Sequence, residues 1–566
     1  MIKEKIIKKI SLVLEKTFNK KIIIDIQTPK NINFGDYSTA IALKLTKIIK
    51  KNPFEIAQEI IKNFDKEDII EKIEIIKPGF INFWLSKSYL ANQLIFFAED
   101  KFNFPKYHLG KNKKIMIEFA QPNTHKLFHI GHLRNISTGE SLVRIFEALD
   151  NKVIRANYQG DVGMHIAKCL YAIKKSIRQS AEIIDKLKTL KEKVDFIGKM
   201  YTEGTKAYEE NEKAKQKIIK INQQIYNQDK EILPLWQETR KWSLEYFDKI
   251  YKRVGSRFDR FYFESEMAKR AIEICNKALK KNILEKSEKA VIFNGKKYNL
   301  DTRVFINSLG YPTYEGKELA LAEKEFSEFG DLDKNIHVVT PEQTSFFKVT
   351  FKVEELINPK IKGKQQHLAY EWVNLKTGKM SSRQGNIIEA NWLIDKIKEK
   401  IIKNFNCDEK TGETLAVASI KYSFLKNSPQ TPINFDIEES IGIDGNSAPY
   451  VIYTYVRCQS ILKKSNIKFT NKTLDINNFE NPELNLLRKI YQFPEIVLKS
   501  AENYSPSFIA TYLYELASDY NLFYQKFPIL NAKEKIKENR ILITLAVANI
   551  IKKGLELLGI KTVEKM

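Results

Sequence analysis

Residues 114–163 alternate between short apolar runs and a segment with helical spacing, and this pattern restricts the fold more than any other part of the chain. "KIMIEF" (114–119) is an apolar strand, a loop containing Gly and His follows, and a helix is expected over 133–149 before a second strand, "KVIRANY" (152–158). Strand, helix and strand at this spacing form a βαβ unit, which requires a parallel sheet with a right-handed crossover. Ligands of such sheets bind past the carboxyl ends of the strands, where both following loops lie.

The length indicates several domains. The chain has 566 residues, and single hydrophobic cores stop growing at about 250–300 residues. We expect an α/β multidomain protein. Its predicted parts are a small N-terminal α/β domain (1–108), a parallel-sheet domain (109–435) with a helical insertion (about 170–255), and an all-α C-terminal domain (436–566). Within the first part, "KKIIIDIQ" (20–27) is predicted as a strand and "IEKIEIIKPGFINFWLS" (70–86) as two strands around a Pro-Gly turn.

The net charge limits the kinds of binding partner to be expected, and the cysteine content limits the cellular compartments. Lys and Arg number 94 against 70 Asp and Glu, a net charge of +24. Such a basic protein usually meets a polyanion, with nucleic acid the leading candidate and a general bias toward Lys the alternative. The four cysteines form no CxxC, so neither a zinc site nor a disulfide framework is indicated. Because no apolar run approaches the ~18–20 residues of a membrane span and no signal-peptide core is found, the expected location is the cytoplasm.

"HIGH" (129–132) lies between the first strand and the crossover helix. A helix N-terminus offers unpaired N–H groups and a partial positive charge, which favour a phosphate. Gly131 has no Cβ to keep a ring or phosphate from the backbone, and His129 and His132 are three apart, so they face the same side. The chain has no GxxxxGK[ST] and no GxGxxG, the two common phosphate motifs. Taken alone, an HxGH pattern is more often two unrelated surface histidines.

"GKMSSRQGN" (378–386) has a glycine near each end, which suits a loop that opens and closes. Lys379, with the hydroxyls of Ser381 and Ser382, can hold phosphates and stabilise developing negative charge. On its own, this stretch is equally well explained as a basic surface turn.

In this order and at this separation, the two motifs resemble the paired signatures of class I aminoacyl-tRNA synthetases. The resemblance narrows to the arginyl-tRNA synthetase family and covers essentially the whole chain. It rests on "EFAQPNTHKLFHIGHLRN" (118–135), "NYQGDVGMH" (157–165), "YPTYEGKELAL" (311–321), "TPEQTSFF" (340–347) and "HLAYEWV" (367–373). "GDY" (35–37) with "PGFINF" (78–83) resembles the family's additional tRNA-contacting domain, and "LELLGIKTVEKM" (555–566) resembles the end of its anticodon-binding domain.

The resemblance implies a Rossmann-like catalytic domain that ligates L-arginine to tRNA(Arg) through an arginyl-adenylate. It implies ATP with Mg²⁺ and tRNA as partners. Separately from the resemblance, we expect no metal held by the protein, no membrane association and a monomer, although the sequence itself does not determine the oligomeric state. The implied ATP and catalytic residues are His129, His132, Lys126 and Lys379, with Gly131, Ser381 and Ser382 also at the nucleotide. The implied arginine residues are Glu118, Tyr314 and Glu318 around the guanidinium, with Asn123 and Gln343 at the α-amino and carboxylate groups. Carboxylates suit a planar guanidinium because they can pair with it bidentately.

Some positions depart from the family pattern. Many relatives carry Asp where Glu318 stands, "FAQPN" replaces small hydroxyl residues before Pro-Asn, and Phe346 stands where a His often follows the pocket Gln. Many members also lack a clear second signature and use a Lys near the first, so the relative weight of Lys126 and Lys379 stays open. The alternatives are another class I synthetase, such as the cysteinyl or glutamyl enzyme, or a non-catalytic tRNA-binding paralogue. A zinc-binding cysteinyl pocket would need ligands that the scattered cysteines do not offer.

Overall fold

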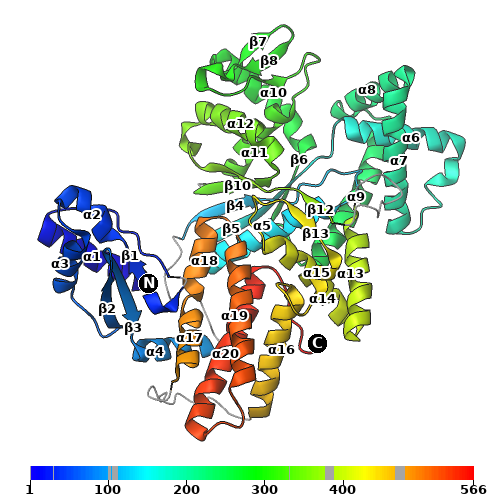
Figure 1. Ribbon diagram of the computed structural model, residues 1–566. Coiled ribbons are helices and arrows are strands. Elements are labelled where there is room, and N and C mark those ends of the chain that lie inside the picture. Colours follow the sequence, from blue (N-terminus) through cyan, green and yellow to red (C-terminus); the bar gives the residue numbers. More distant parts are fainter. Residues whose placement is uncertain are drawn as a thin grey trace.

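The computed structural model describes residues 2–29, 31–99, 104, 112–330, 332–376, 388–465 and 479–566. Lys379, Ser381 and Ser382 lie outside these ranges. Figure 1 shows a small N-terminal domain beside a helical bundle, with the parallel sheet above the bundle and two further lobes beyond the sheet.

The N-terminal domain is a three-stranded antiparallel sheet, in the order β1-β3-β2, covered by helices. Its elements are α1 (Ile2–Phe18), β1 (Tyr37–Thr39), α2 (Ile41–Ile49), α3 (Pro53–Lys62), β2 (Ile70–Ile76) and β3 (Phe80–Leu85). β2 and β3 confirm the predicted pair of strands. The strand predicted over 20–27 is wrong: of this segment only Gln27 forms a bridge, with Ser38. Burial still alternates there, because Ile24 and Ile26 are buried while Ile23 is 90% exposed.

A five-stranded parallel sheet forms the second domain, in the order β11-β10-β4-β5-β6. Its strands are β4 (Lys114–Glu118), β5 (Lys152–Gln159), β6 (Arg260–Phe263), β10 (Lys334–Val339) and β11 (Gln365–Ala369). Successive strands are first added on one side of β4 and then on the other, so the order reverses between β4 and β10. This reversal is the switch point of a Rossmann-like sheet, where a ligand crevice opens at the carboxyl ends. The predicted parallel-sheet architecture is confirmed.

The crossover helix α5 (Ile130–Ala148) joins β4 to β5 and begins at Ile130 rather than at the predicted 133. Gly139 allows its close approach to the chain that follows β4. A Cβ at this position would lie 2.2 Å from Cγ of Phe119, a separation that real atoms do not reach. Glycine is therefore required where the helix crosses the end of β4.

The helical insertion between β5 and β6 consists of α6 (Met164–Gln179), α7 (Leu190–Glu210), α8 (Glu212–Tyr226) and α9 (Leu233–Arg253). Asp161, in the loop after β5, ties it to the sheet. Its carboxylate accepts from Arg240 Nε at 2.8 Å and from Ser265 Oγ at 2.7 Å, and its carbonyl accepts from Trp236 Nε1 at 2.8 Å. The loop after β5 is thereby held by α9 and by α10 (Glu264–Lys280).

A second excursion separates β6 from β10. It contains α10, the antiparallel strands β7 (Glu285–Ser287), β8 (Ala290–Phe293) and β9 (Arg303–Ile306), and α11 (Tyr314–Glu328). After β10 come α12 (Thr344–Ile357), then β11, β12 (Val373–Leu375), α13 (Ala390–Phe405), α14 (Glu409–Leu425), β13 (Ile433–Phe435) and α15 (Ile437–Ile441). β12 and β13 form a separate parallel pair.

The described residues after 441 form only helices, as the sequence predicted for this part of the chain. They are α16 (Ala448–Ser465), α17 (Asn481–Tyr491), α18 (Phe493–Glu502), α19 (Ser507–Lys526) and α20 (Glu534–Leu557). Helix α4 (Lys87–Ala98) packs against α17 and α20, and its Phe97 carbonyl accepts from Asn549 Nδ2 at 3.2 Å. The N-terminal part of the chain thus contributes a helix to the bundle.

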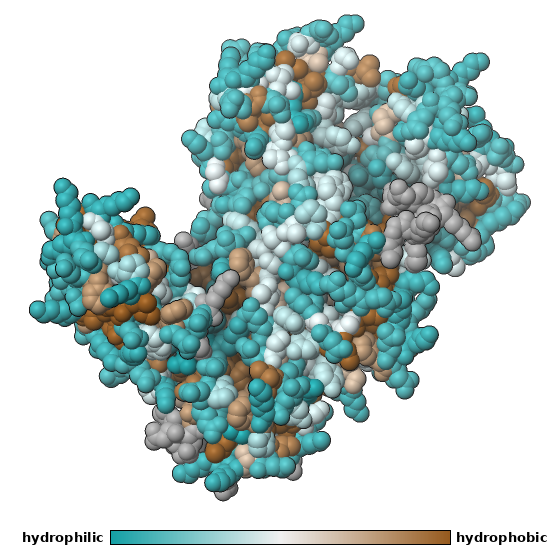
Figure 2. Space-filling model, in the orientation of Figure 1, coloured by the Kyte–Doolittle hydropathy of each residue, from teal (hydrophilic) through white to brown (hydrophobic). Residues whose placement is uncertain are grey.

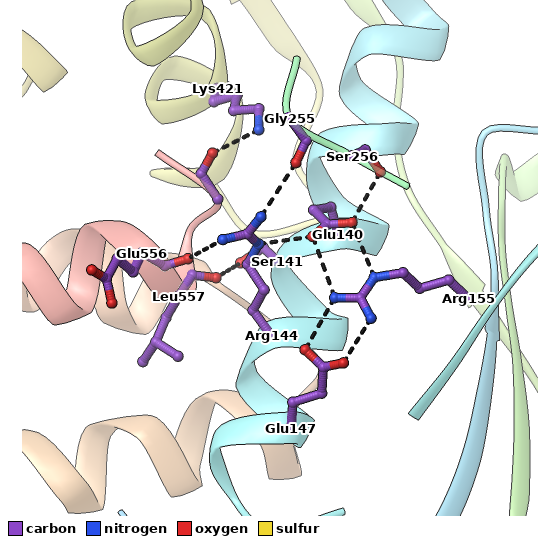
Figure 3. A network of polar contacts seen from close by, with 11 residues as sticks. Glu140, Ser141, Arg144, Glu147, Arg155, Gly255, Ser256, Lys421, Glu556 and Leu557 are labelled. Atoms are coloured by element: carbon purple, nitrogen blue, oxygen red, sulfur yellow. Dashed lines mark hydrogen bonds and ion pairs between the residues drawn. The ribbon is translucent and has the colours of Figure 1, made fainter. Parts of the chain in front are cut away.

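The end of α20 packs on α5 (Figure 3). Ser141 Oγ donates to the Leu557 carbonyl at 3.0 Å, and Arg144 Nη1 donates to the Glu556 carbonyl at 3.2 Å. Lys421 of α14 donates to the Gly559 carbonyl at 2.7 Å. Residues 556–559 therefore complete the packing around the crossover helix.

The N-terminal domain is attached to the bundle through its "GDY" segment. Asp36 Oδ1 accepts from Arg488 Nε at 3.1 Å. The Tyr37 hydroxyl lies 2.8 Å from the Tyr491 hydroxyl and donates to Glu495 Oε1 at 2.5 Å. Asp36 and Tyr37 are both buried, so these contacts form a closed joint between the two domains.

The face shown in Figure 2 is mainly hydrophilic, with apolar residues in scattered patches. Among the helices that the structure describes, none has both the length and the apolar character needed to cross a membrane.

Candidate active site

The predicted site residues that the structure describes lie around the switch point. Glu118 ends β4, and Asn123 follows it and bridges to Gly160 after β5. His129 is the N-cap of α5, and Gln343 follows β10 in a short 3₁₀ turn. The loops that follow β4, β5 and β10 therefore lie at the same edge of the sheet, where the βαβ pattern predicts a ligand crevice.

The rings of His129 and His132 pack against each other at the start of α5, with 32° between their planes. Their ring centroids are 3.8 Å apart. Nδ1 of His129 accepts from the Gly131 N–H at 3.1 Å, and Nδ1 of His132 accepts from the His129 N–H at 3.2 Å. Because backbone N–H groups can only donate, both Nδ1 atoms are unprotonated and each neutral ring carries its proton on Nε2. The pair can present two Nε2–H donors to a ligand.

Burial and a neighbouring lysine keep both imidazoles neutral. Burial, with the charge of Lys126, lowers the pKa of His129 to about 4. Burial, with His129 and Lys126, lowers the pKa of His132 well below its ordinary value. Lys126 Nζ lies 5.3 Å from the centre of the Tyr201 ring of α7. The positive charge at this end of the crevice near pH 7 thus comes from Lys126, while the histidines act as neutral donors.

The expectation of unpaired backbone N–H groups at the start of α5 is wrong for Ile130 and Gly131. Ile130 N–H donates to the Ile388 carbonyl at 3.0 Å, and Gly131 N–H is taken by His129. A Cβ on Gly131 would lie 3.0 Å from Cε1 of His129, so the missing side chain makes room for that ring. A phosphate here would be met by imidazole donors in place of these two N–H groups.

The segment that follows the second motif pairs with the first motif. Ile388 accepts from Ile130, and Ala390 N–H donates to the Phe128 carbonyl at 2.9 Å. The Glu389 carboxylate accepts from the Tyr246 hydroxyl of α9 at 3.0 Å. The chain on the carboxyl side of 377–387 is therefore hydrogen-bonded to the residues around His129.

Arg134 binds the chain on the amino side of the same segment. Its buried guanidinium donates to five backbone carbonyls. These belong to Glu371, Trp372, Ser428, Pro429 and Thr431, at 2.6 to 3.4 Å. Burial lowers the pKa of Arg134 to about 10, so it stays charged at neutral pH. The helix that carries the histidine pair thus also holds the strands β12 and β13.

Glu118 and Glu318 flank a single imidazole, that of His337. His337 Nδ1 lies 3.2 Å from Glu118 Oε2 and 3.9 Å from Glu318 Oε1. All three side chains are buried. Neither Nδ1 nor Glu118 Oε2 has an aligned hydrogen-bond partner among the described residues. Two acids on different elements, with polar atoms left over, indicate a site for a buried cationic group.

Two further acids lie near His337. Glu325 of α11 accepts from Asn335 at 2.7 Å, and Glu354 of α12 accepts from Gln365 at 2.8 Å. Burial raises the pKa of Glu325 well above its ordinary value and that of Glu354 to about 7. The pocket therefore combines several acids with one imidazole on the carboxyl-end side of β10.

The other residues predicted to bind arginine are more accessible to solvent than Glu118 and Glu318. Tyr314 and Glu318 lie on α11, as the helical prediction required, but Tyr314 is 58% exposed while Glu318 is buried. Asn123 faces Gly160, where a Cβ would lie 2.0 Å from its Oδ1. Gln343 is exposed. None of these three side chains is buried, in contrast to Glu118 and Glu318.

Sequence reasoning missed His337. It lies within "NIHVV" on β10, in an apolar run where one histidine looks like a core residue. Its role depends on the strand register, in which His337 is paired with Glu118. A buried-strand histidine just before a loop at the switch point was the available signal.

The fold and the two-sided crevice define the class of protein: this is a class I aminoacyl-tRNA synthetase. The model described as "tRNA synthetases class I (R), catalytic domain" matches residues 97–436. The chain belongs to the arginyl-tRNA synthetase family. The "Arginyl tRNA synthetase N terminal domain" matches residues 1–85, and the "DALR anticodon binding domain" matches 451–566.

Relatives and solved structures agree with this assignment. Arginine–tRNA ligase of Fusobacterium nucleatum is 31% identical over 557 residues, covering 96% of this chain and 95% of its own. That of Halothermothrix orenii is 30% identical over 580 residues, covering 100% and 99%. Among solved structures, arginyl-tRNA synthetase of Thermus thermophilus has a TM-score of 0.83 at 22% identity, covering both chains fully. That of Plasmodium falciparum has a TM-score of 0.82 at 23% identity, covering 100% of this chain and 99% of its own.

Proposed function

We propose that this protein ligates L-arginine to tRNA(Arg) at the expense of ATP, through an arginyl-adenylate formed in the switch-point crevice. The observation that carries the proposal is the arrangement around the end of β4. There the buried acids Glu118 and Glu318 flank His337, and the histidine pair of α5 follows β4 in the chain. One end of the crevice suits a guanidinium and the other suits phosphates.

The ATP half is assigned to the start of α5. The Nε2–H groups of His129 and His132 donate to phosphate oxygens, and Lys126 supplies a positive charge beside them. Neutral, oriented donors stabilise charge that develops in the transition state without having to reorganise. Lys379, Ser381 and Ser382 are proposed to bind the leaving β- and γ-phosphates. Gly131 has no side chain, and this leaves space for the His129 ring.

The arginine half is assigned to the acidic pocket. Glu118 and Glu318 accept N–H groups of the guanidinium, whose planar donors suit two carboxylates. Tyr314 covers the pocket from the first turn of α11. Asn123 and Gln343 orient the α-amino and carboxylate groups toward the α-phosphate.

The chemistry follows from positioning. The arginine carboxylate attacks the α-phosphate in line and pyrophosphate leaves. The terminal ribose 2′-hydroxyl of tRNA then attacks the adenylate carbonyl, the acyl–phosphate bond breaks and AMP leaves. No side chain becomes covalently modified, so catalysis consists of orientation and charge stabilisation. Mg²⁺ is proposed to enter with ATP, held by phosphate oxygens and water. No cluster of three or more metal-binding side chains occurs in the part of the chain that the structure describes.

The remaining assignments are also proposals. The N-terminal domain (1–108) contacts tRNA, the catalytic domain spans 109–435, and the helical domain (436–566) binds the anticodon. The net charge of +24 suits a large polyanionic substrate. The protein is proposed to act as a monomer in the cytoplasm.

An ATP–pyrophosphate exchange assay with each amino acid, with and without tRNA, tests the proposal. Exchange with arginine alone among the amino acids is expected, and family membership implies that it requires tRNA. Exchange with a different amino acid would point to another class I synthetase. No exchange under any condition, with tRNA binding intact, would favour a non-catalytic paralogue.

A further inference from the structure

We propose that His337 is a stand-in cation: before arginine binds, its imidazolium balances Glu118 and Glu318, and arginine binding expels its proton. The inference rests on the proposed function of this pocket. It assigns a role in amino-acid specificity to a residue outside the predicted arginine set.

The hydrogen-bond pattern determines where the His337 proton must lie. Gln365 Nε2 donates to Glu354 Oε2 at 2.8 Å, so its Oε1 is left facing His337 Nε2 at 2.9 Å. An amide oxygen only accepts, so Nε2 of His337 carries a hydrogen. If the ring were neutral, Nδ1 would direct a bare lone pair at Glu118 and Glu318. A second proton on the ring removes that repulsion.

Groups from every neighbouring element act on this imidazole. Burial alone would lower the pKa of His337, but Glu118, Glu318 and Glu325 outweigh it and raise that pKa well above its ordinary value. Around the ring lie the acids Glu118 (β4), Glu318 and Glu325 (α11) and Glu354 (α12), the phenol Tyr158 (β5), the amide Gln365 and the imidazole His367 (β11), and the rings Phe347 and Phe351 (α12). No lysine or arginine occurs in this set, so the imidazolium is its cation.

Arginine cannot share the pocket with that charge. A guanidinium stays protonated under all working conditions, so it brings a positive charge to the same two carboxylates. The guanidinium and the imidazolium N–H compete for the same carboxylate oxygens, and a guanidinium that takes them leaves the adjacent imidazolium without its partners. The proton on Nδ1 passes to solvent, and the exposed lone pair can then accept one of the five guanidinium N–H donors. A neutral amino acid would leave both carboxylates occupied by the imidazolium.

The direction of the pH effect follows from linkage. When the free protein binds one more proton than the complex, arginine affinity rises with pH. Over the range where His337 is charged in the free pocket, the arginine Kd should tighten by up to about tenfold per pH unit. Above that range, the affinity should become independent of pH.

Calorimetric titration of the full-length protein with L-arginine, in two buffers of different protonation enthalpy, counts the protons. The wild type should release about one proton per arginine near neutral pH. His337→Gln should release close to none and should lose the pH dependence. The matched control is His367→Gln on the adjacent strand. His367 has a lowered pKa and its Nε2 donates to the Val339 carbonyl at 3.1 Å, so the proton count should stay as in the wild type.

The outcomes separate this inference from the proposed function. Burial and the Glu118 charge also raise the pKa of Glu318, which makes Glu318 the competing source of a proton. Unchanged release in His337→Gln would overturn the inference in favour of Glu318. No release from the wild type would overturn it whether or not any variant folds. Arginine affinity unaffected by Glu318→Gln would instead remove the proposed pocket itself.

Discussion

At the scale of single residues, burial decides which groups in the crevice are charged. The histidine pair of α5 is neutral because it is buried beside Lys126, whereas His337 is buried among acids and holds a proton. The same side chain thus has opposite electrostatic roles at the two ends of one crevice. The phosphate end relies on oriented neutral donors and the arginine end on acids with a balancing cation.

Glu318→Gln is expected to raise the KM for arginine by tenfold or more while the KM for ATP stays near normal. The amide keeps the shape of the side chain but removes a charge-assisted hydrogen bond, worth about 1.5–3 kcal/mol. Steady-state exchange kinetics measure both constants. Glu323→Gln is the control, because Glu323 lies on the same helix but is exposed and pairs with Arg270. Unchanged arginine kinetics in Glu318→Gln would exclude this residue from the pocket.

Lys379→Ala is expected to slow adenylate formation by about 10²–10³-fold, the range seen when one preorganised donor to a developing charge is lost. The tRNA affinity should change little, because the lysine is assigned to pyrophosphate. Single-turnover kinetics and tRNA binding give the two quantities. Lys376→Ala, at an exposed lysine paired with Asp436, is the matched control. Equal losses in rate and tRNA affinity would contradict the assignment.

At the residue scale, sequence reasoning succeeded where a motif is local. His129 and His132 were predicted to face the same side, and their ring centroids lie 3.8 Å apart. The two Nδ1 acceptors could not be predicted, because they depend on ring orientation at the helix start. His337 could not be predicted either, because its environment comes from β4, α11, α12 and β11.

At the scale of elements, α5 organises the catalytic domain. It starts with the histidine pair, holds β12 and β13 through Arg134, and contacts β4 and β10 through Asn135. Asn135 accepts from Ala120 N–H at 2.6 Å and donates to the Val338 carbonyl at 2.8 Å. Small displacements of this helix would move the phosphate donors relative to the acidic pocket.

Gly139→Ala is therefore expected to lower both stability and activity. The added methyl group would overlap the Phe119 ring, and overpacking of this kind typically costs about 1–3 kcal/mol. Thermal melting together with exchange kinetics measures the two effects. Gly445→Ala is the control, since a Cβ there meets no atom within 4 Å. If both variants melted alike, α5 would have room that the structure does not show.

The element pattern was largely predictable because the periodicity is strong. The βαβ unit, the helical insertion and the C-terminal helices follow from spacing alone. The segment 20–27 was mispredicted even though its burial alternates. Alternation reports which faces are buried, whereas a strand also needs a neighbour in register, and only Gln27 finds one.

At the scale of the whole molecule, the N-terminal domain and the bundle are joined by buried polar contacts. Burial raises the pKa of Asp36 against the opposing effect of Arg488, and burial raises the pKa of Glu495. A buried hydrogen-bonded joint has one geometry, so it specifies an orientation in a way that an apolar contact does not. The "GDY" segment thus serves domain placement.

Tyr37→Phe is expected to weaken tRNA affinity several-fold while ATP affinity is unchanged. Loss of the hydroxyl leaves the half-buried Glu495 carboxylate without this donor, at a cost of about 1–3 kcal/mol to the joint. Filter binding of tRNA and small-angle scattering report affinity and domain placement. Tyr298→Phe is the control, because that side chain is 42% exposed. Scattering and affinity identical to the wild type would show that the joint is not needed to place the domain.

The contact between residues 556–559 and α5 has a consequence for biosynthesis. The strands of the parallel sheet are translated long before Leu557. Until then, Ser141, Arg144 and Lys421 of the nascent catalytic domain lack these carbonyl partners. The protein should therefore gain its active conformation only after residue 559 has been translated and released from the exit tunnel. Fragments that stop at the end of the catalytic domain should be incompletely folded and should depend on chaperones.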